Sequence, residues 1–443
     1  MFKKYFNNRL FILYVAPFFL GLLTVFSFQP YNLTIINFLV LPLFFYLTVY
    51  INKKSKSNFR KKPYRKNFFI FGCLFGFGFY LSGISWITNS LTFDENFKIL
   101  IPFALIFIPL FLSLFVGIAI LLIGPLLSYN LSSILIFSAA LGFSDFLRAK
   151  ILTGFPWNLW SYSLSWATET IQILNLTGLF AFNLIVITFF TLPIFLFLKI
   201  CIKKKIIFLL SYLSFILGIY IFGVYEINKN NNFLKTINKK INVKIISPNF
   251  ALEYGLSLSQ IEDKLKKLIR YSEPQVNKKT LFIWPEGIFS GYRFEEILIF
   301  KDIIQKNFNK NHYLIFGINK LDQTSGSFYN SLILVDNNFD VIHQYNKQKL
   351  VPFGEFLPFE SQLSKFGLKK ITEGHGSFKK GKNQNNIKID VLNILPLICY
   401  EVIFTSFIQQ ASFDTNLIVN ISEDAWFGNT IGPEQHYVKS IFR

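Results

Sequence analysis

The sequence predicts a bundle of membrane-spanning α-helices over residues 1–225, followed by an α/β domain over residues 226–443. Three observations carry this prediction. The 443-residue chain is 52% hydrophobic and only 16% charged, a composition that would leave a soluble protein with large exposed apolar patches. Its apolar residues in the first half form stretches of bilayer-spanning length. The second half alternates strand-like and helix-like segments, which is typical of an α/β sheet.

The net charge of +20 has to be placed along the chain before it can be interpreted. Residues 1–225 hold 18 Lys and Arg against 4 Asp and Glu, a net charge of +14, whereas residues 226–443 hold 27 against 21, a net +6. The hydrophobicity excludes a disordered basic tail. We expect no nucleic-acid partner, because the excess of cations lies in the loops between apolar stretches.

Seven apolar stretches reach or approach the roughly 20 residues that span a bilayer. They cover residues 10–28, 33–51, 67–90, 99–128, 131–149, 171–199 and 206–225. With the N-terminus in the cytoplasm, 15 Lys and Arg fall on the inner side and 3 on the outer side. This positive-inside pattern predicts a bacterial inner-membrane protein with a cytoplasmic N-terminus and a periplasmic second half.

One loop on the predicted outer side contains the string TGFPW, residues 153–157. Aromatic residues at this depth commonly form an interfacial belt, and that interpretation stays open. The same string lies beside the cations Arg148 and Lys150 and would also suit a lipid headgroup.

In the second half we expect strands at residues 241–246, 280–284, 313–317, 331–335, 394–399 and 416–421, and helices at 257–271 and 295–308. Chemistry in such domains gathers at the ends of strands. Two strings at predicted strand ends, around Glu286 and Cys399, therefore become candidates for a site, and the string around Lys347 is a third candidate because of its Pro and Gly residues.

Cys399 ends a predicted strand and is the one cysteine of the second half. In an oxidising compartment it is an intermolecular disulfide partner, an inert core thiol or a nucleophile. Glu286 follows a strand that Pro285 interrupts, and it is either a solvated turn carboxylate or a base. Lys347 taken alone would be a solvated surface lysine, but it lies in a run that contains Pro352 and Gly354, which favours an ordered loop over a mobile one.

Other catalytic patterns receive no support. The four histidines, His312, His343, His375 and His436, show no arrangement that singles one out as a base. No GxSxG string offers a serine nucleophile. No Cys/His cluster has the spacing of metal ligands, so we expect neither a metal nor a cofactor.

Six strings, in order along the chain, carry a resemblance to a known family: TGFPW, WPEG, YNKQKLVPFGE, CYE, VNISEDAWFG and IGPEQH. WPEG, YNKQKLVPFGE and CYE resemble the Glu–Lys–Cys sites of the nitrilase superfamily. Together with the multi-span first half, the six strings resemble the apolipoprotein N-acyltransferase family over nearly the whole chain. The resemblance implies an αββα sandwich for residues 226–443.

The resemblance also implies roles for individual residues. Glu286 would be the general base, Lys347 the cation that stabilises the oxyanion, and Cys399 the nucleophile that accepts the acyl group. Supporting residues would be Glu355, Glu401, Tyr400, Tyr345 and Asn346. Residues near the lipid would be Phe155, Trp157, Trp426, Phe427 and, in the place of a family Trp, Tyr254. Lys349 would be an ordinary surface lysine.

The implied reaction moves an acyl chain from a membrane phospholipid through a Cys399 thioester to the N-terminal amine of a diacylglyceryl apolipoprotein. Two alternatives remain: a membrane-tethered amidase acting on a small soluble substrate, and a transporter or receptor. The latter would need ionisable residues inside the spans, where only Asp145 and Arg148 clearly lie. The family continues past IGPEQH with more sheet and an eighth span, so we expect the C-terminal part to be missing at Arg443.

Overall fold

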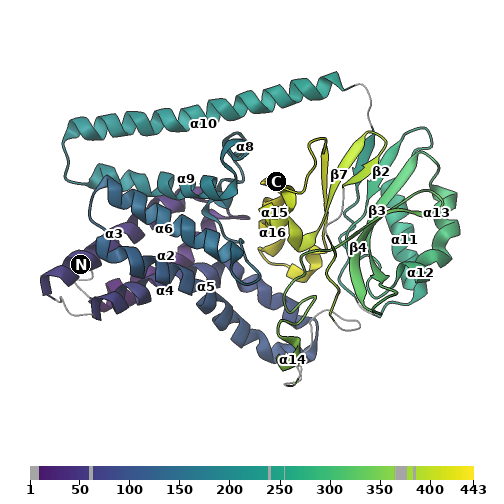
Figure 1. The fold of residues 1–443 in the computed structure, drawn as a ribbon, viewed down its shortest axis with the longest axis horizontal. Helices are drawn as coiled ribbons and strands as arrows, with labels where there is room; N and C mark the ends of the chain where they lie inside the picture. Colours follow the sequence, from purple (N-terminus) through teal and green to yellow (C-terminus); the bar gives the residue numbers. More distant parts are fainter. Residues whose placement is uncertain are drawn as a thin grey trace. The chain divides into compact units, whose positions relative to one another are not determined.

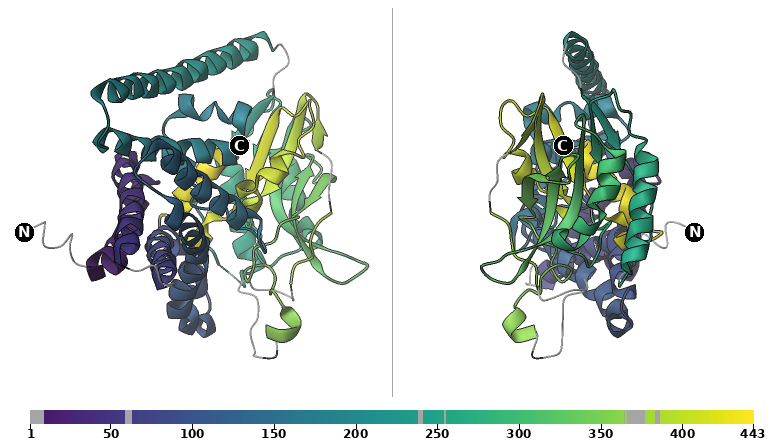
Figure 2. Two further views of the ribbon diagram at one scale, coloured as in Figure 1. Left: turned by 60° about the vertical axis from the view of Figure 1, so that its left-hand side comes forward. Right: turned by 90° about the vertical axis from the view of Figure 1, so that its right-hand side faces the viewer.

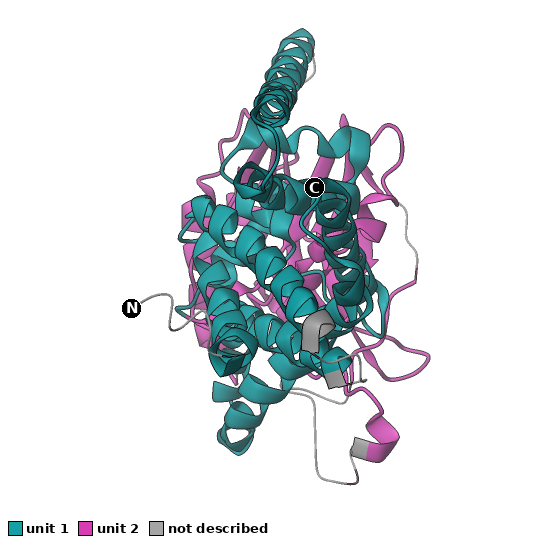
Figure 3. Cartoon of the chain, turned by 90° about the vertical axis from the view of Figure 1, so that its left-hand side faces the viewer, with its two compact units in different colours: residues 1–236, 429–442 teal, residues 237–428, 443 magenta. Residues whose placement is uncertain are grey.

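The computed structural model describes residues 9–58, 63–237, 241–253, 255–363, 365, 377–382 and 386–443. The chain forms two compact units (Figure 3): residues 1–236 with 429–442, and residues 237–428 with 443. We call them the helical unit and the sandwich unit. A helix at Ile202–Thr236 crosses the domain boundary that we predict at residue 226, and that boundary stays a prediction.

Long apolar helices make up the helical unit (Figure 1). Its main helices are α2 (Ala16–Leu23), α3 (Asn37–Asn58), α4 (Pro63–Ile84), α5 (Ile101–Ile123), α6 (Leu131–Lys150), α9 (Leu179–Thr191) and α10 (Ile202–Thr236). The shorter α7 (Thr168–Ile171), α8 (Leu174–Thr177) and α16 (Gly432–Ile441) complete it. Six helical stretches in the described residues are long and apolar enough to cross a membrane. The shorter apolar stretch Phe11–Ser27 corresponds to the first of the seven predicted spans.

Helices α4 and α5 approach each other closely because small residues face one another. A Cβ atom on Gly72 would lie 2.9 Å from the Cα atom of Gly117, and one on Gly76 would lie 2.9 Å from the Cα atom of Ser113. Small residues at such positions let two apolar helices pack backbone to backbone, which is how helices associate in lipid. The pairing therefore explains why glycine interrupts these otherwise bulky, phenylalanine-rich helices.

The sandwich unit contains two β-sheets. The larger sheet has the strand order β1 (Asn242–Ile245), β2 (Thr280–Ile283), β3 (His312–Leu321), β4 (Phe328–Val335) and β5 (Val341–Asn346). The smaller sheet consists of β6 (Ile387–Ile389), β7 (Leu392–Ile398) and β8 (Leu417–Ile421). Strands β1, β2 and β3 are parallel, β4 is antiparallel to both of its neighbours, and β7 and β8 are parallel.

Alternation along the strands builds two layers of core. Leu281, Ile315 and Leu332 join Ile394 and Val419 of the smaller sheet in one buried cluster. The two sheets therefore pack face to face, because successive side chains of a strand point to opposite faces. Figure 2 shows the smaller sheet, the larger sheet and the helices as successive layers.

The opposite face of the larger sheet is covered by α11 (Leu258–Ser272), α12 (Phe294–Ile297) and α13 (Lys301–Asn307). Leu265 and Ile304 of these helices pack with Phe282 and Phe316 of the strands.

All six predicted strands are present. The helix predicted at residues 295–308 is interrupted by a 3-10 turn at Leu298–Phe300. Strands β5 and β6 were not expected.

Candidate functional site

The three strings with candidate chemistry meet in the sandwich unit because their strands end at the same edges. Strand β5 is antiparallel to β4, which is antiparallel to β3, so β5 runs parallel to β2 and β3. Glu286 lies three residues after β2, and Lys347 directly follows β5. Cys399 directly follows β7 in the facing sheet. Carboxyl ends of parallel strands are where α/β sheets place their ligands.

Lys347 is the centre of a buried polar cluster. Its side-chain ammonium lies 2.9 Å from Glu355 Oε1 and 3.3 Å from Glu286 Oε1. Asn330, on β4, donates its side-chain amide to both carboxylates, at 2.7 Å to Glu286 and 2.8 Å to Glu355. The second oxygen of each carboxylate accepts a backbone N–H, from Glu423 for Glu286 and from Val351 for Glu355. Each member of the cluster is thus fixed by at least two partners.

Electrostatics keep Lys347 charged although its side chain is only 1% exposed. Burial alone would lower the pKa of Lys347, but the negative charges of Glu286 and Glu355 outweigh it and raise that pKa above its ordinary value. A permanently charged ammonium at this position can stabilise an oxyanion that forms beside it.

Cys399 has the left-handed backbone angle φ of +49°, a conformation that costs a non-glycine residue energy and recurs at functional sites. Burial and the charge of Glu286 raise the pKa of the thiol, while Lys347 and a hydrogen bond with Ser422 act in the opposite direction. The resting thiol is therefore neutral. A reaction at its sulfur needs a base to remove the proton, and Glu286 is the carboxylate whose charge it feels most.

Glu401 ties the two sheets together at the site. One of its oxygens accepts the backbone N–H groups of Gln348, at 2.6 Å, and Lys349, at 3.0 Å. The other accepts the N–H of Ile398 and the hydroxyl of Tyr345, both at 2.9 Å. These four donors flank Lys347 and Cys399. Glu401 thus holds the backbone beside both residues, and burial raises its pKa to about 7 despite these hydrogen bonds.

The remaining supporting residues shape the surroundings. Asn346 accepts hydrogen bonds from Ser331 and Gln344, so its side chain is engaged within the larger sheet. Tyr400 is buried, which raises its pKa, and its ring packs edge-on against Phe404 with centroids 5.1 Å apart.

Two residues of the cluster, Asn330 and Glu423, were not singled out from the sequence. Asn330 lies within β4 in a polar string, YNS, that gave no signal of its own. Glu423 belongs to the quoted string VNISEDAWFG, but nothing in that string distinguishes it. Its side chain accepts the N–H of Ala425, and burial together with the charge of Glu286 raises its pKa to about 7.

Two of the five residues predicted near lipid lie in the helical unit. Trp157 is 1% exposed, and its indole N–H donates to Gln435 at 2.8 Å. His436 stacks on the ring at 5.8 Å, and the ammonium of Lys439 lies 4.2 Å from its centroid. Phe155 stacks on the same ring. The structure thus packs the TGFPW string against the helix that contains GPEQH, and the lipid contact stays a prediction.

Trp426 and Phe427 lie in the 3-10 turn Asp424–Phe427 after β8. Trp426 is partly exposed and Phe427 is buried. Tyr254 lies outside the described residues. Contact of these three side chains with lipid also stays a prediction.

Two family models match the chain. Residues 20–192 match the apolipoprotein N-acyltransferase N-terminal domain, and residues 253–440 match the carbon-nitrogen hydrolase model. The second match supports the predicted nitrilase-type fold of the sandwich unit.

Similar proteins were found among curated sequences and solved structures. The apolipoprotein N-acyltransferase of Rickettsia prowazekii is 32% identical over 380 residues, which cover 83% of this chain and 73% of the relative. That of Bradyrhizobium diazoefficiens is 28% identical over 439 residues, covering 96% and 80%. A nitrilase-superfamily amidase of Nesterenkonia is 16% identical with a TM-score of 0.27, covering 42% and 67%. That TM-score is too low to support an argument about the fold.

Proposed function

Because this chain belongs to the apolipoprotein N-acyltransferase family, we propose that it moves an acyl chain from a membrane phospholipid to the N-terminal amine of a diacylglyceryl apolipoprotein, with Cys399 as the intermediate acyl carrier. The observation that carries the proposal is the ammonium of Lys347, which is held between Glu286 and Glu355. The charges of Lys347 and Glu286 both act on the thiol of Cys399 at the end of β7. This set supplies a base, an oxyanion-stabilising cation and a nucleophile, which acyl transfer requires.

In the first step, Glu286 removes the thiol proton of Cys399, and the sulfur attacks the ester carbonyl of the phospholipid. Lys347 stabilises the negative oxygen of the tetrahedral intermediate. The intermediate collapses to a thioester, and the ester C–O bond breaks. The departing lysophospholipid oxygen takes the proton back from Glu286.

In the second step, the α-amino group of the diacylglyceryl-cysteine attacks the thioester. Glu286 accepts a proton from the attacking nitrogen, and the C–S bond of the second tetrahedral intermediate breaks. The sulfur leaves with that proton, so the free thiol is restored and an amide has formed. Two half-reactions that share one enzyme intermediate predict ping-pong kinetics.

The helical unit supports a lipid substrate over a soluble one. Exposing an acyl chain to water costs about 0.8 kcal/mol per CH2 group, so donor and acceptor are best held in a bilayer. The match of residues 20–192 to the N-terminal acyltransferase domain gives no support to an amidase acting on a small soluble substrate.

The protein is a bacterial membrane protein. We further propose that its N-terminus is cytoplasmic and its sandwich unit periplasmic. The support is the distribution of cations, 15 on one side of the predicted spans and 3 on the other. Alkaline phosphatase fused after Gly428 should then be active, and a fusion within residues 53–66 inactive. The reverse pattern would overturn this orientation.

Replacing the nucleophile tests the chemistry. The full chain, purified in detergent, is incubated with a phospholipid carrying a labelled acyl chain, with and without a diacylglyceryl-cysteine lipopeptide. Wild-type protein should acquire a hydroxylamine-sensitive label and pass it to the lipopeptide.

Cys399→Ser should lose the thioester and at least about a thousandfold of the transfer rate. Cys73→Ser and Cys201→Ser serve as matched controls and should keep both activities. Full transfer by Cys399→Ser would exclude the proposed nucleophile.

A further inference from the structure

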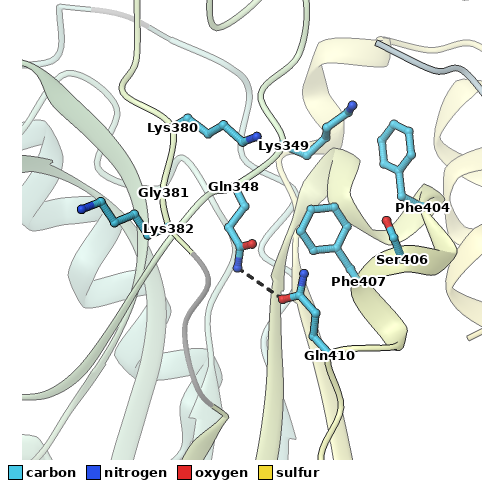
Figure 4. A pocket seen from close by; sticks show the side chains of 9 residues that line it. All are labelled: Gln348, Lys349, Lys380, Gly381, Lys382, Phe404, Ser406, Phe407 and Gln410. Atoms are coloured by element: carbon cyan, nitrogen blue, oxygen red, sulfur yellow. Dashed lines mark hydrogen bonds between the residues drawn. The ribbon is translucent and has the colours of Figure 1, made fainter. Parts of the chain in front are cut away.

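A polar pocket of about 320 Å³ lies in the sandwich unit beside the segment that contains Lys347 (Figure 4). Three stretches of chain line it: Gln348 with Lys349, the segment from Lys380 to Lys382, and side chains between Phe404 and Gln410. The mechanism proposed above uses none of these side chains, so the pocket needs a separate explanation.

The pocket is positively charged. Three of its nine lining residues are lysines, and none of the nine, all within the described part of the chain, is acidic. Figure 4 shows Lys380 extending toward Lys349 and Lys349 directed toward Phe404, whereas Lys382 extends to the other side. The ammonium of Lys349 lies 4.8 Å from the centre of the Phe404 ring. Lys349, expected as an ordinary surface lysine, therefore borders a cavity.

The frame of the pocket is rigid because it shares its hydrogen bonds with the candidate active site. The N–H of Gly381 donates to the carbonyl of Lys347 at 2.8 Å, and the N–H of Gln348 donates to Glu401. The side chain of Gln348 is 4% exposed, and Phe404 and Phe407 are buried as well. A ligand would thus meet lysine side chains above a preformed floor, at a small cost in ordering the protein.

We propose that this pocket binds the phosphate group of an organic phosphate ester. Lysine ammonium groups are compact donors that suit phosphate, and two such side chains lining one pocket with no acidic residue match an anion with several acceptor oxygens. The buried rings of Phe404 and Phe407 offer apolar contact to the carbon atoms next to the phosphate. A volume of about 320 Å³ is near the lower limit for small-molecule pockets, so the pocket fits a headgroup-sized ligand rather than acyl chains.

The phosphate ester has two possible sources. One is the glycerophosphate headgroup of a phospholipid, and this assignment rests on the proposed function. The other is a soluble phosphate ester that binds independently of acyl transfer. Binding of the phosphate itself does not depend on Cys399, so it can be tested separately from the reaction.

The binding test uses the full chain in detergent, titrated by calorimetry with sn-glycerol 3-phosphate and, as a reference anion, with acetate. Wild type should bind glycerol 3-phosphate and not acetate. The double variant Lys349→Gln/Lys380→Gln should bind at least about tenfold more weakly.

The variant Lys349→Arg/Lys380→Arg keeps both charges and should retain binding to within about threefold. The matched control Lys306→Gln/Lys310→Gln removes two exposed lysines of the same unit and should bind like wild type. The proposal is overturned if wild type fails to bind, or if the Lys349/Lys380 glutamine variant binds like the control.

Steady-state transfer then identifies the source. If the phospholipid headgroup occupies the pocket, the glutamine variant raises KM for the phospholipid several-fold and leaves kcat within about twofold. If a soluble ester occupies the pocket, the glutamine variant loses glycerol 3-phosphate binding but keeps the wild-type KM for the phospholipid. A third outcome separates the two proposals. If Cys399→Ser still binds glycerol 3-phosphate and still transfers the acyl chain, the proposed nucleophile is rejected and the pocket assignment is left intact.

Discussion

Buried clusters of charged side chains lie in both units, and they differ in how their charges balance. In the helical unit, Arg148 lies 2.9 Å from one carboxylate, Asp145. Asn183 donates to Asp145, and Arg148 donates to the carbonyl of Phe155. In the sandwich unit, one ammonium, that of Lys347, lies between two carboxylates.

We interpret the balanced cluster as structural and the unbalanced one as the reactive site of the proposed mechanism. In the helical unit, a cation and an anion neutralise each other, and neutral groups complete their hydrogen bonds. This cluster connects α6 to the TGFPW string through the Phe155 carbonyl and α9 to the 3-10 helix Trp160–Leu164, since Asn183 also accepts the N–H of Ser161. In the sandwich unit, carboxylates outnumber the ammonium by one, so the cluster can take up a proton from the nearby thiol. A buried ion pair alone does not indicate catalysis, because structural ion pairs such as Arg148–Asp145 are buried as well.

The largest effect is expected from Lys347→Met. This change leaves two carboxylates buried without the ammonium between them, which costs about 3–5 kcal/mol, and it removes the stabilising charge for the oxyanion. We expect the N-acylation rate to fall by at least about a thousandfold and thermal unfolding in detergent to shift downward.

The control for Lys347→Met is Lys379→Met, which removes a partly exposed lysine paired with Asp322 and should change neither the N-acylation rate nor the unfolding temperature appreciably. Near-normal transfer by Lys347→Met would contradict the assigned role.

An intermediate effect is expected at the balanced cluster. Arg148→Met leaves Asp145 buried and unpaired by charge, which should lower the unfolding free energy of the full chain by about 3–5 kcal/mol. The double variant Asp145→Leu/Arg148→Met removes both charges and should recover most of that loss, because apolar replacement of a complete pair is often neutral.

Thermal unfolding of the three proteins in detergent measures this recovery. A double variant as unstable as Arg148→Met would mean that the hydrogen bond from Arg148 to the Phe155 carbonyl, and not charge balance, holds the cluster.

The smallest effect is expected from Glu423→Gln, and it should depend on pH. Burial raises the pKa of Glu423 to about 7 in the folded chain, above about 4.3 for an unfolded glutamate. Between these two pKa values, Glu423 is protonated in the folded chain and ionised in the unfolded chain. The wild-type free energy of unfolding therefore falls as pH rises from about 4.5 to 7 and is then constant.

The variant lacks this ionisation. Its unfolding temperature relative to wild type should therefore be higher at pH 8 than at pH 5. Asp302→Asn, an exposed carboxylate on α13, serves as the comparison and should show no such trend. An equal difference at both pH values for Glu423→Gln would argue against a buried, protonatable Glu423.

Local sequence patterns predicted six of the strands of the sandwich unit, because apolar runs and the residues that end a strand can be recognised from neighbouring residues in the sequence. They missed β5, whose sequence VIHQYN exposes Val341 and Ile342 and buries few apolar side chains. Its position is set by pairing with β4 across the sheet. Such pairing depends on tertiary contacts and leaves a weak local signal.

The candidate site likewise combines residues that local sequence could predict with residues that only tertiary contacts bring into it. Glu286 and Cys399 could be chosen because each lies at or near a predicted strand end, whereas Lys347 could be chosen only from its string and the resemblance, because β5 before it was not predicted. Asn330 could not, because it lies inside β4 and acquires its role only when two carboxylates from other strands reach it. The burial of Trp157 could not be predicted either, because Gln435, His436 and Lys439 lie about 280 residues away in the sequence.

Glu401 has a consequence for the order in which the site forms. Its carboxylate accepts hydrogen bonds from the backbone N–H groups of Gln348, Lys349 and Ile398. These groups belong to two segments that lie about 50 residues apart in the sequence. These three amides should exchange with solvent as one cooperative unit, since opening either segment releases the shared acceptor. A chain whose two sheets have not yet docked would hold Lys347 and Cys399 apart, so reactivity at the thiol arises only with the completed fold.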